Sequence, residues 1–388
     1  MMHLTLLCIF FAGMGLIIHT YLVYPLVMIW RFRRRELTAS SGSFAQLPRV
    51  SILIAAYNEE KVIKEKIQSV LNGNYPQELI TVYVGSDASS DLTDELVKEL
   101  SVNYPNVHLH RFENREGKTG ILNKLQHFIK DDFMILTDAN VFFTTDTVSL
   151  LMAPFYEQSV GLVAANIIKT SEKNEGISLQ EKKYLSLENQ LKSAESKAWG
   201  FIMGAEGGCY AIRKSLFCQI PGNFIVDDFY ITLQVLNQGK KAVFCEEAVC
   251  YEDVAGDSAG EFRRKVRISS GNFQNLYFFR NLLFPLWRPL AFSFWSHKVL
   301  RWFTPFLLLI LLIVSLSLAP HFPLFSVLAA LQLIGLTLPV LNHYFKFRTE
   351  SLRFISHFYL MNAALLAGFF RYIKGIQSSI WQPVERNV

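Results

Sequence analysis

Two long stretches of this chain carry no charged side chain, and they restrict the fold more than any other feature. The first runs from Leu4 to Trp30 and the second from Trp302 to Leu341. Each is long enough to cross a hydrocarbon layer about 30 Å thick, and the second could cross twice by turning at Pro320 to Pro323. Phe354 to Phe370 is a third candidate span. The sequence therefore predicts an integral membrane protein with a polar middle.

Charges beside the first span predict its orientation. No Lys or Arg precedes it, and Arg31 to Arg35 follows it directly, which argues against a cleaved signal peptide and for a cytoplasmic exit. We therefore expect a multi-pass protein of the inner (cytoplasmic) membrane with a cytosolic middle region. The five cysteines show no metal-type pairing, and a disulfide framework is not expected in a reducing compartment.

The side of the carboxyl-terminal tail stays open at this point. Three spans after the polar middle would leave the tail outside, whereas Arg371, Lys374 and Arg386 favour the cytosol. One late segment could instead be re-entrant or interfacial.

Strand, loop and helix patterns alternate through the polar middle. Buried strands are predicted at residues 49–56, 79–85 and 107–111 and from Phe133, with helices between them. This alternation predicts an α/β fold with a mainly parallel sheet and right-handed crossovers.

The strand from Phe133 ends in a polar segment that is the first candidate site. Asp138 and Asn140 are two residues apart, so their side chains point the same way. Ligands of open α/β sheets bind outside the carboxyl ends of strands, which suits a metal-bound phosphate here. The alternative is an ordinary Asx turn.

Four segments in this order resemble the motifs of family-2 glycosyltransferases, the superfamily of cellulose, hyaluronan and poly-N-acetylglucosamine synthases. They are Val50 to Glu60, Ser86 to Asp91, Thr137 to Asn140 and Val226 to Asp228. The resemblance covers roughly residues 50–275. It implies a GT-A type nucleotide-sugar-binding domain and a membrane-anchored hexosyltransferase.

The resemblance assigns donor-binding roles to several residues. Tyr57 and Glu59 would line the nucleoside pocket, and Asp87 would accept a hydrogen bond from the base, as suits the imide N–H of uracil. Lys118, at a helix start, would meet a phosphate. Asp87 could instead cap a helix or turn, and Lys118 could be an ordinary solvated lysine.

A metal and a base are also implied. Asp138 would hold Mg²⁺ or Mn²⁺ against the leaving diphosphate, with Asn140 standing where the family carries a second carboxylate. Asp228 matches the catalytic base, which gives an inverting displacement, and Asp227 would orient it or cap the helix. The alternative is that both aspartates only cap the helix.

Two further segments match the family at the acceptor side and the leaving group. Gly204, Glu206 and Gly207 lie in a glycine-rich segment that would approach an acceptor sugar, and the alternative is that the glycines only serve a tight strand turn. Arg264 and Arg267 occupy the family's Gln-x-x-Arg-Trp element, where Arg267 would clamp the diphosphate. Ile268 replaces the tryptophan, which puts processive polymerisation in doubt.

From Glu261 to Arg301 there are eight Lys or Arg and one acid, mixed with aromatic residues. This mixture favours a helix in the membrane interface over nucleic-acid binding. The predicted organisation is a first span with its basic flank (1–36), a linker (37–48), the cytosolic GT-A domain (49–275), an amphipathic interfacial segment (276–301), about three membrane helices (302–373) and a tail (374–388).

The expected function is inverting, metal-dependent transfer of a sugar from a UDP-sugar to a lipid-linked or growing polysaccharide acceptor, with membrane lipids as further partners. Transfer to a polyprenyl phosphate is the nearest alternative. A rival from another class is a catalytically silent membrane partner that binds nucleotide sugar or scaffolds a synthase.

Overall fold

The computed structural model describes residues 1–35, 46–170, 177–253, 258–347 and 349–376. The chain divides into two compact units. The helical unit comprises Met1–Trp30, Lys173–Ser186 and Asp257–Ile376, and the sheet unit comprises Arg31–Glu172 and Leu187–Gly256. Most of the predicted linker (37–48) and tail (374–388) lies outside the described residues.

The sheet unit is built on one mixed sheet whose strand order is β3-β2-β1-β4-β7-β6-β8-β5. The strands are β1 Val50–Ala56, β2 Ile80–Asp87, β3 Val107–Phe112, β4 Phe133–Asp138, β5 Val141–Phe143, β6 Val160–Thr170, β7 Cys209–Arg213 and β8 Lys241–Asp253. The first four are parallel to one another, and β7 joins β4 antiparallel. The predicted α/β class with a mainly parallel mixed sheet is confirmed.

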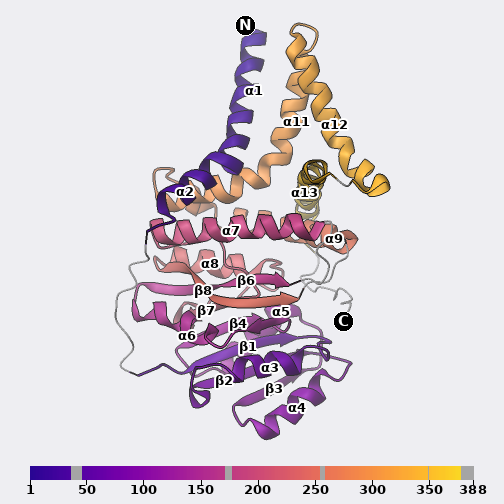
Figure 1. Cartoon of the computed structure of the whole chain (residues 1–388). Coiled ribbons are helices and arrows are strands. Elements are labelled where there is room, and N and C mark those ends of the chain that lie inside the picture. The colour runs from indigo at the N-terminus through magenta and orange to yellow at the C-terminus, as the bar shows by residue number, and fades with distance from the viewer. Residues whose placement is uncertain (36–45, 171–176, 254–257, 348, 377–388) are drawn as a thin grey trace. The chain divides into compact units, whose positions relative to one another are not determined.

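Helices connect the strands of the sheet unit (Figure 1). They are α3 Ile63–Leu71, α4 Thr93–Asn103, α5 Gly117–Leu125, α6 Thr147–Met152 and α8 Asp227–Asn237, with short 3-10 turns at Gln77–Leu79, Gln126–Phe128, Ala153–Tyr156 and Lys214–Leu216. Helix α7 Ile177–Trp199 is divided between the units, because its residues up to Ser186 belong to the helical unit. Helix α3 shows how the pattern works, because Ile63, Ile67 and Val70 recur at helical spacing and are all fully buried.

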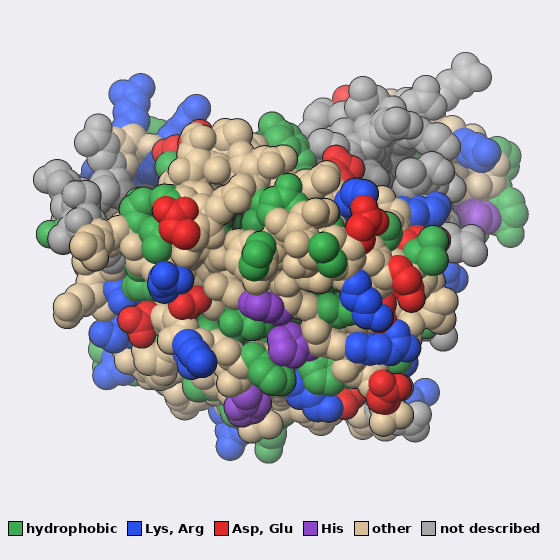
Figure 2. Space-filling view, turned by 90° about the horizontal axis from the view of Figure 1, so that it is seen from below, with side chains coloured by type: hydrophobic (Ala, Val, Ile, Leu, Met, Phe, Trp, Pro, Cys, Tyr) green, Lys and Arg blue, Asp and Glu red, His purple; other side chains and the backbone are tan. Residues whose placement is uncertain are grey.

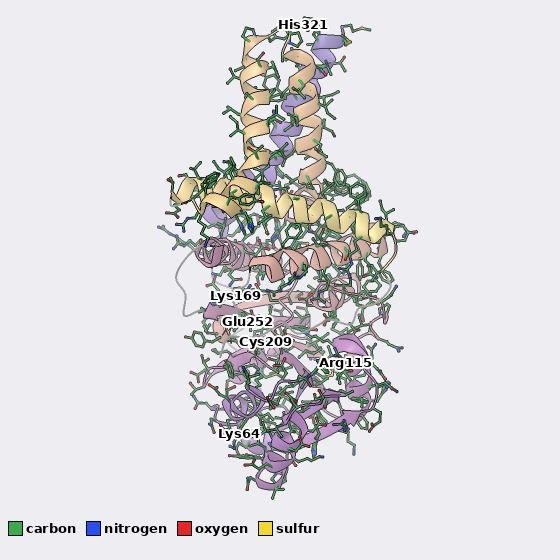
Figure 3. The ribbon with its side chains drawn as sticks, turned by 90° about the vertical axis from the view of Figure 1, so that its right-hand side faces the viewer. Lys64, Arg115, Lys169, Cys209, Glu252 and His321 are labelled. Carbon is green, nitrogen blue, oxygen red and sulfur yellow. The ribbon has the colours of Figure 1, made fainter. Side chains whose placement is uncertain are left out.

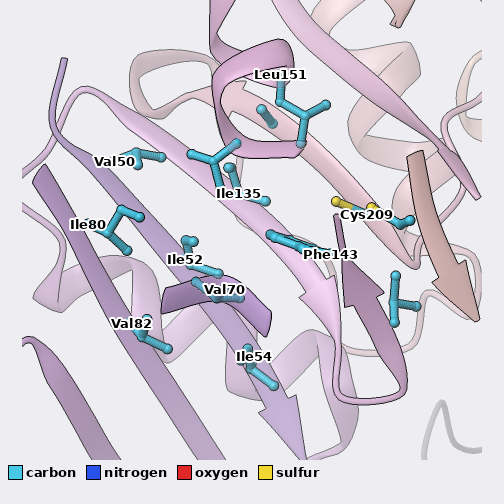
Figure 4. Packing of buried hydrophobic residues seen from close by; sticks show 14 of the residues in the cluster. Val50, Ile52, Ile54, Val70, Ile80, Val82, Ile135, Phe143, Leu151 and Cys209 are labelled. Atoms are coloured by element: carbon cyan, nitrogen blue, oxygen red, sulfur yellow. The ribbon is translucent and has the colours of Figure 1, made fainter. Parts of the chain in front are cut away.

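The core lies along the central parallel strands (Figure 4). Ile52 and Ile54 of β1 and Ile135 of β4 are completely buried. Figure 4 shows Val70 of α3 and Leu151 of α6 among the side chains of this core. Strands that are covered on both faces need nearly continuous apolar sequence, which is why β4 reads as an unbroken apolar run before Thr137.

The strand register brings three polar exits to one edge of the sheet. Ala55 of β1 pairs with Asp138 of β4, and Ala56 pairs with Ser86 of β2. Asn58 and Ala88, in the loops that follow β1 and β2, have φ values of 54° and 57°, which non-glycine residues rarely adopt. The Asn58 Oδ1 atom accepts a hydrogen bond from the Ser90 amide at 2.9 Å, so the two loops support each other.

On the face that Figure 2 shows, charged side chains of both signs are scattered among polar and hydrophobic ones. One such surface pair is Lys64 and Glu99, whose Nζ and Oε1 atoms are 3.3 Å apart. A surface of interspersed charges is typical of contact with water.

The helical unit contains long apolar helices. Its elements are α1 Met2–Ile18, η1 His19–Val23, α2 Tyr24–Phe32, α9 Ser258–Phe278, η6 Arg280–Leu283, α10 Pro289–Ser293, η7 Phe294–Val299, α11 Leu300–Leu318, α12 Pro323–Phe345 and α13 Glu350–Ile373. Among the described residues, four continuous helical runs are long and apolar enough to cross a membrane: Met2–Phe32, Pro289–Leu318, Pro323–Phe345 and Glu350–Ile373. This finding supports the expected membrane association.

Helices α1, α11 and α12 pack together through an apolar cluster. Phe10 of α1 and Phe325 of α12 lie 5.0 Å apart between ring centroids, and Leu311 and Leu318 of α11 belong to the same cluster. The second apolar run begins at Pro289, so it crosses the boundary predicted at residue 301, and the segment predicted as one interfacial helix is divided among α9, η6, α10 and η7.

Candidate active site

Lys118 and Asp138 form the centre of the candidate site. The Lys118 Nζ atom lies 2.5 Å from Oδ1 of Asp138 and 3.0 Å from the carbonyl oxygen of Gly207. Gly117, which has a φ of 75°, begins α5 and so sets the direction from which Lys118 enters. The structure thus joins the end of β4, the start of α5 and the glycine-rich segment, all of which the sequence singled out.

Asp227 and Asp228 stand in the first turn of α8 and reach the same place. A Cβ atom added to Gly207 would lie 2.9 Å from Oδ2 of Asp228 and 3.3 Å from Nζ of Lys118. Glycine is therefore needed at 207 for these two groups to approach this closely. Among the described residues, the buried Oδ2 atom of Asp227 has no hydrogen-bond partner.

The charges at this site do not balance. Burial would lower the pKa of Lys118, but the charges of Asp138 and Asp227 outweigh burial and raise that pKa. Burial, followed by the charge of Asp227, raises the pKa of Asp228 from 3.8 to about 7. One ammonium group therefore faces three carboxyl groups, and the site has spare negative charge near neutral pH.

The residues at the end of β4 fit a divalent cation that is shared with a substrate. No three His, Cys, Asp or Glu side chains converge on one point in the part of the chain that the structure describes. Mg²⁺, however, is commonly held by one or two carboxylates together with substrate phosphates. Asp138 and the half-buried Asn140 offer oxygen ligands, and the buried oxygen of Asp227 adds negative charge.

The predicted nucleoside side contains an arginine that sequence reasoning did not single out. The guanidinium carbon of Arg115 lies 3.2 Å from the ring centroid of Tyr57, and its Nε atom is 3.1 Å from Oδ2 of Asp87 (Arg115 is labelled in Figure 3). Asp87 also accepts hydrogen bonds from the amides of Glu116 and Gly117 at 2.7 and 3.0 Å. Asp87 therefore supports the start of α5. Base binding by Asp87, Tyr57 and the buried Glu59 stays a prediction.

The acceptor-side candidates lie near a buried ion pair. Nζ of Lys192, on α7, is 2.5 Å from Oε1 of Glu206, and Lys192 is only 3% exposed. Burial opposes the charge of Lys192, but Glu206 and Glu188 raise its pKa. Gly204 has a φ of 98°, and a Cβ atom there would lie 2.6 Å from the Phe229 ring. Backbone conformation and packing therefore explain the glycine at this position without a bound sugar.

Arg264 and Arg267 are both half-buried residues of α9. That helix belongs to the helical unit, whereas the aspartates belong to the sheet unit. The roles of these two arginines toward a diphosphate stay predictions.

Lys66 is a further residue that the sequence analysis missed. It is completely buried on α3, and its Nζ atom hydrogen bonds to Thr137 Oγ1 at 3.0 Å and to the carbonyl oxygen of Val141. The Nζ atom also lies 3.6 Å from the centroid of the Phe143 ring. Lys66 therefore links both ends of the loop that carries Asp138 and Asn140. A lysine on the apolar stripe of α3 was the sequence feature that could have predicted a buried role for Lys66.

Comparison with known proteins gives the family. The Glycosyl transferase family 2 pattern matches residues 51–220, which contain the β1, β2 and β4 exits and Gly207. The chain contains a family-2 glycosyltransferase domain. The family resemblance expected from the four motifs is confirmed.

Curated relatives of this glycosyltransferase chain include sugar polymer and glycolipid synthases. "Probable glycosyltransferase YdaM" of Bacillus subtilis is 24% identical over 68% of this chain, and the poly-beta-1,6-N-acetyl-D-glucosamine synthase of Staphylococcus aureus is 23% identical over 60%. The beta-monoglucosyldiacylglycerol synthase of Trichormus variabilis is 32% identical over 30%. The chain spans 66%, 56% and 25% of the lengths of these relatives, respectively.

A solved structure shares the fold. The mannosyltransferase PcManGT from Pyrobaculum calidifontis, solved in complex with GDP-Man and Mn²⁺, aligns with a TM-score of 0.68 at 20% identity. The alignment covers 94% of this chain and 99% of that one. The GT-A type fold of this glycosyltransferase is thereby confirmed.

Replacing Lys66 with methionine tests whether the buried ammonium positions the Asp138 loop. Methionine keeps an unbranched apolar chain but cannot hold Thr137 and Val141 together. Supporting groups behind metal ligands are typically worth about 10–100-fold in metal affinity, so we expect Mn²⁺ to bind more weakly by that factor in the presence of UDP. Mn²⁺ electron paramagnetic resonance titration would measure it. Lys64→Met, which removes an exposed lysine two positions earlier, is the matched control; an unchanged affinity in folded Lys66→Met would show that Lys66 only fills space.

The raised pKa of Asp228 predicts a pH-dependent gain in stability for Asp228→Asn. Between pH 3.8 and about 7 the folded protein keeps a proton that the unfolded chain has released, so wild-type stability falls as pH rises through this window. Asparagine cannot ionise and avoids that loss. The gain should be on the order of 1 to 4 kcal/mol above the window and small near pH 4.

Apparent melting temperatures in detergent with EDTA at pH 5 and pH 8.5 would measure this difference. Asp132→Asn, at an exposed carboxylate, is the control. A gain of the same size at both pH values would mean that Asp228 is not destabilised by its charge.

Proposed function

We propose that this chain catalyses inverting, divalent-metal-dependent transfer of a sugar from a UDP-sugar to a lipid-linked or growing glycan acceptor, at the cytosolic face of the membrane in which it is a multi-pass protein. The observation that carries the proposal is the meeting of Lys118, Asp138 and Asp228 around Gly207. The region that matches the family-2 glycosyltransferase pattern, residues 51–220, contains Lys118, Asp138 and Gly207. Four apolar helical runs support membrane attachment.

Asp228 is the group that we assign to the acceptor. Its pKa of about 7 lets it accept a proton near neutral pH and release it afterwards. The acceptor hydroxyl would lose its proton to Asp228 as its oxygen bonds to the anomeric carbon and the bond to the diphosphate breaks. A single displacement of this kind inverts the configuration of the sugar.

Asp138 and Lys118 are the groups that we assign to the diphosphate. A divalent cation bound at Asp138 would neutralise negative charge that develops on the leaving diphosphate. The ion pair between Lys118 and Asp138 can exchange for one between Lys118 and phosphate oxygens, because both side chains are partly exposed. Arg267, in the helical unit, is a candidate for a bidentate contact to a diphosphate by the family resemblance alone.

The similar proteins agree with this choice of chemistry. PcManGT was solved with a nucleotide sugar and Mn²⁺, and the names of the curated relatives describe a glycan synthase and a glycolipid synthase. Those names support a glycan or lipid-linked acceptor without distinguishing between the two.

Nucleotide release from a panel of donors tests the proposal. Membranes containing the protein would be incubated with UDP-glucose, UDP-galactose, UDP-N-acetylglucosamine and GDP-mannose, and free UDP and GDP would be measured. We expect UDP release from one UDP-sugar, its loss in EDTA and its return with Mn²⁺ or Mg²⁺. Turnover with GDP-mannose alone would refute the choice of donor, and full turnover in EDTA would refute the metal role. A silent protein that binds but never releases nucleotide would support the partner hypothesis.

Substitution of each aspartate of α8 in turn distinguishes the catalytic base from its neighbour. Asp228→Asn keeps shape but cannot accept the proton, so transfer should fall by at least about 100-fold while UDP binding persists. Asp227→Asn should have the milder effect, since Asp227 acts through the charge that it places beside Asp228. Both variants would be assayed by product formation and by UDP binding. The reverse order of effects would assign the base to Asp227.

A further inference from the structure

Helix α13 has the length of a membrane span but an unsuitable composition. Of the four candidate spans its most apolar window has the lowest mean hydropathy. Glu350, Arg353 and His357 lie in its first turns and Arg371 in its last. Ionisable groups within a span are costly unless they face a protein interior.

The contacts of α13 show that it crosses the end of α11 instead of running beside it. The rings of Phe358 and Tyr21 are 5.4 Å apart, and those of Phe369 and Phe306 are 4.9 Å apart. The guanidinium carbon of Arg301 lies 5.7 Å from the Tyr21 ring, and the Tyr21 hydroxyl is hydrogen bonded to Thr304, so Tyr21 lies beside the first turn of α11.

These contacts can be converted to distances along the helices. Residues 358 and 369 are about 16 Å apart along α13, whereas residues 301 and 306 are only about 7.5 Å apart along α11. A helix parallel to α11 would advance equally along both. The other end of the bundle is marked by His3 and His321, whose ring centroids are 4.3 Å apart. Figures 1 and 3 show α13 running across the direction of α11 and α12.

Close packing holds α13 in this direction. A Cβ atom on Gly368 would lie 2.4 Å from Oγ of Ser269 in α9, and one on Gly335 of α12 would lie 2.5 Å from the Tyr359 hydroxyl. Ser269 Oγ also donates a hydrogen bond to the Leu365 carbonyl oxygen at 2.9 Å. The two glycines let α13 approach both neighbours more closely than any other residue would.

The surface of α13 is inverted relative to a helix in water. Ser356 and Asn362 are 2% and 4% exposed, whereas large apolar side chains point outward. The outward side chains are Leu352, Phe354, Ile355, Phe370 and Ile373. Hiding polar groups while exposing aromatic and aliphatic ones is unfavourable in water and favourable against lipid.

We propose that α13 lies in the membrane interface, with its apolar face against lipid, and that the described part of the chain crosses the bilayer three times, through α1, α11 and α12. The carboxyl end of α13 then lies on the side of Arg31 to Arg35, where Arg371 and Lys374 satisfy the preference of basic residues. This inference rests on the membrane location in the proposed function and not on sugar transfer, so the two can fail separately.

Cysteine labelling from each side of the membrane tests the crossing number. Single cysteines would replace Arg33, His321 and Lys374 in a background where Cys8 and Cys218, the cysteines that are not buried, are serine. A membrane-impermeant maleimide should label Arg33→Cys and Lys374→Cys in inverted vesicles and His321→Cys in intact cells. Labelling of Lys374→Cys together with His321→Cys would overturn the proposal.

Depth measurements provide a second, independent test. Spin labels would be attached to single cysteines at Ile355, Ala363 and Phe370, which are exposed positions of α13. Collision with oxygen and with a nickel chelate should report the same shallow depth at all three. A position 363 that is clearly deeper than 355 and 370 would mean that α13 spans the bilayer. If a spin-labelled variant fails to fold, the side from which Lys374→Cys reacts with the maleimide still decides the number of crossings.

Discussion

The concentration of carboxyl groups around Lys118 is the constraint on which the site depends. Asp138 arrives from β4 and Asp227 and Asp228 from α8, and one ammonium group cannot neutralise all three. Burial, followed by the charge of Asp227, raises the pKa of Asp228 to about 7. A group with that pKa is suited to moving protons at neutral pH, and a site with spare negative charge is suited to receiving a cation with its diphosphate. The same feature thus serves both halves of a sugar transfer.

The backbone around the site is shaped to bring these charges together. Gly207 leaves room for Asp228 and Lys118, and Gly117 turns the chain so that α5 begins beside Asp87. Lys66 hydrogen bonds to both ends of the loop that carries Asp138. Among the described residues, no carboxylate forms a hydrogen bond with the Lys66 ammonium group. Burial lowers the pKa of Lys66 to about 8, which is the expected cost of placing an ammonium group there.

The helical unit has the distribution of exposed side chains expected for contact with lipid. Its apolar side chains point outward along α13 while serine and asparagine face inward. The sheet unit is the reverse, because its isoleucines and valines are buried and charges of both signs are scattered over the face in Figure 2. One chain therefore shows both arrangements, each in the unit whose expected surroundings require it.

Much of this protein was determined by its sequence alone. The periodicity of the polar middle predicted the parallel strands β1 to β4 and helices α3, α4, α5 and α8, and four ordered motifs identified the family. Local patterns suffice there because buried strands and amphipathic helices must carry apolar residues at fixed spacing. Tertiary structure alone decided that Asp138, Lys118 and Asp228 meet and that Asp87 supports the start of α5. It also decided that Lys66 and Arg115 contact the site residues, and in which direction α13 runs. These depend on contacts between residues far apart in the chain, and on which neighbour a helix packs against, which no local spacing encodes.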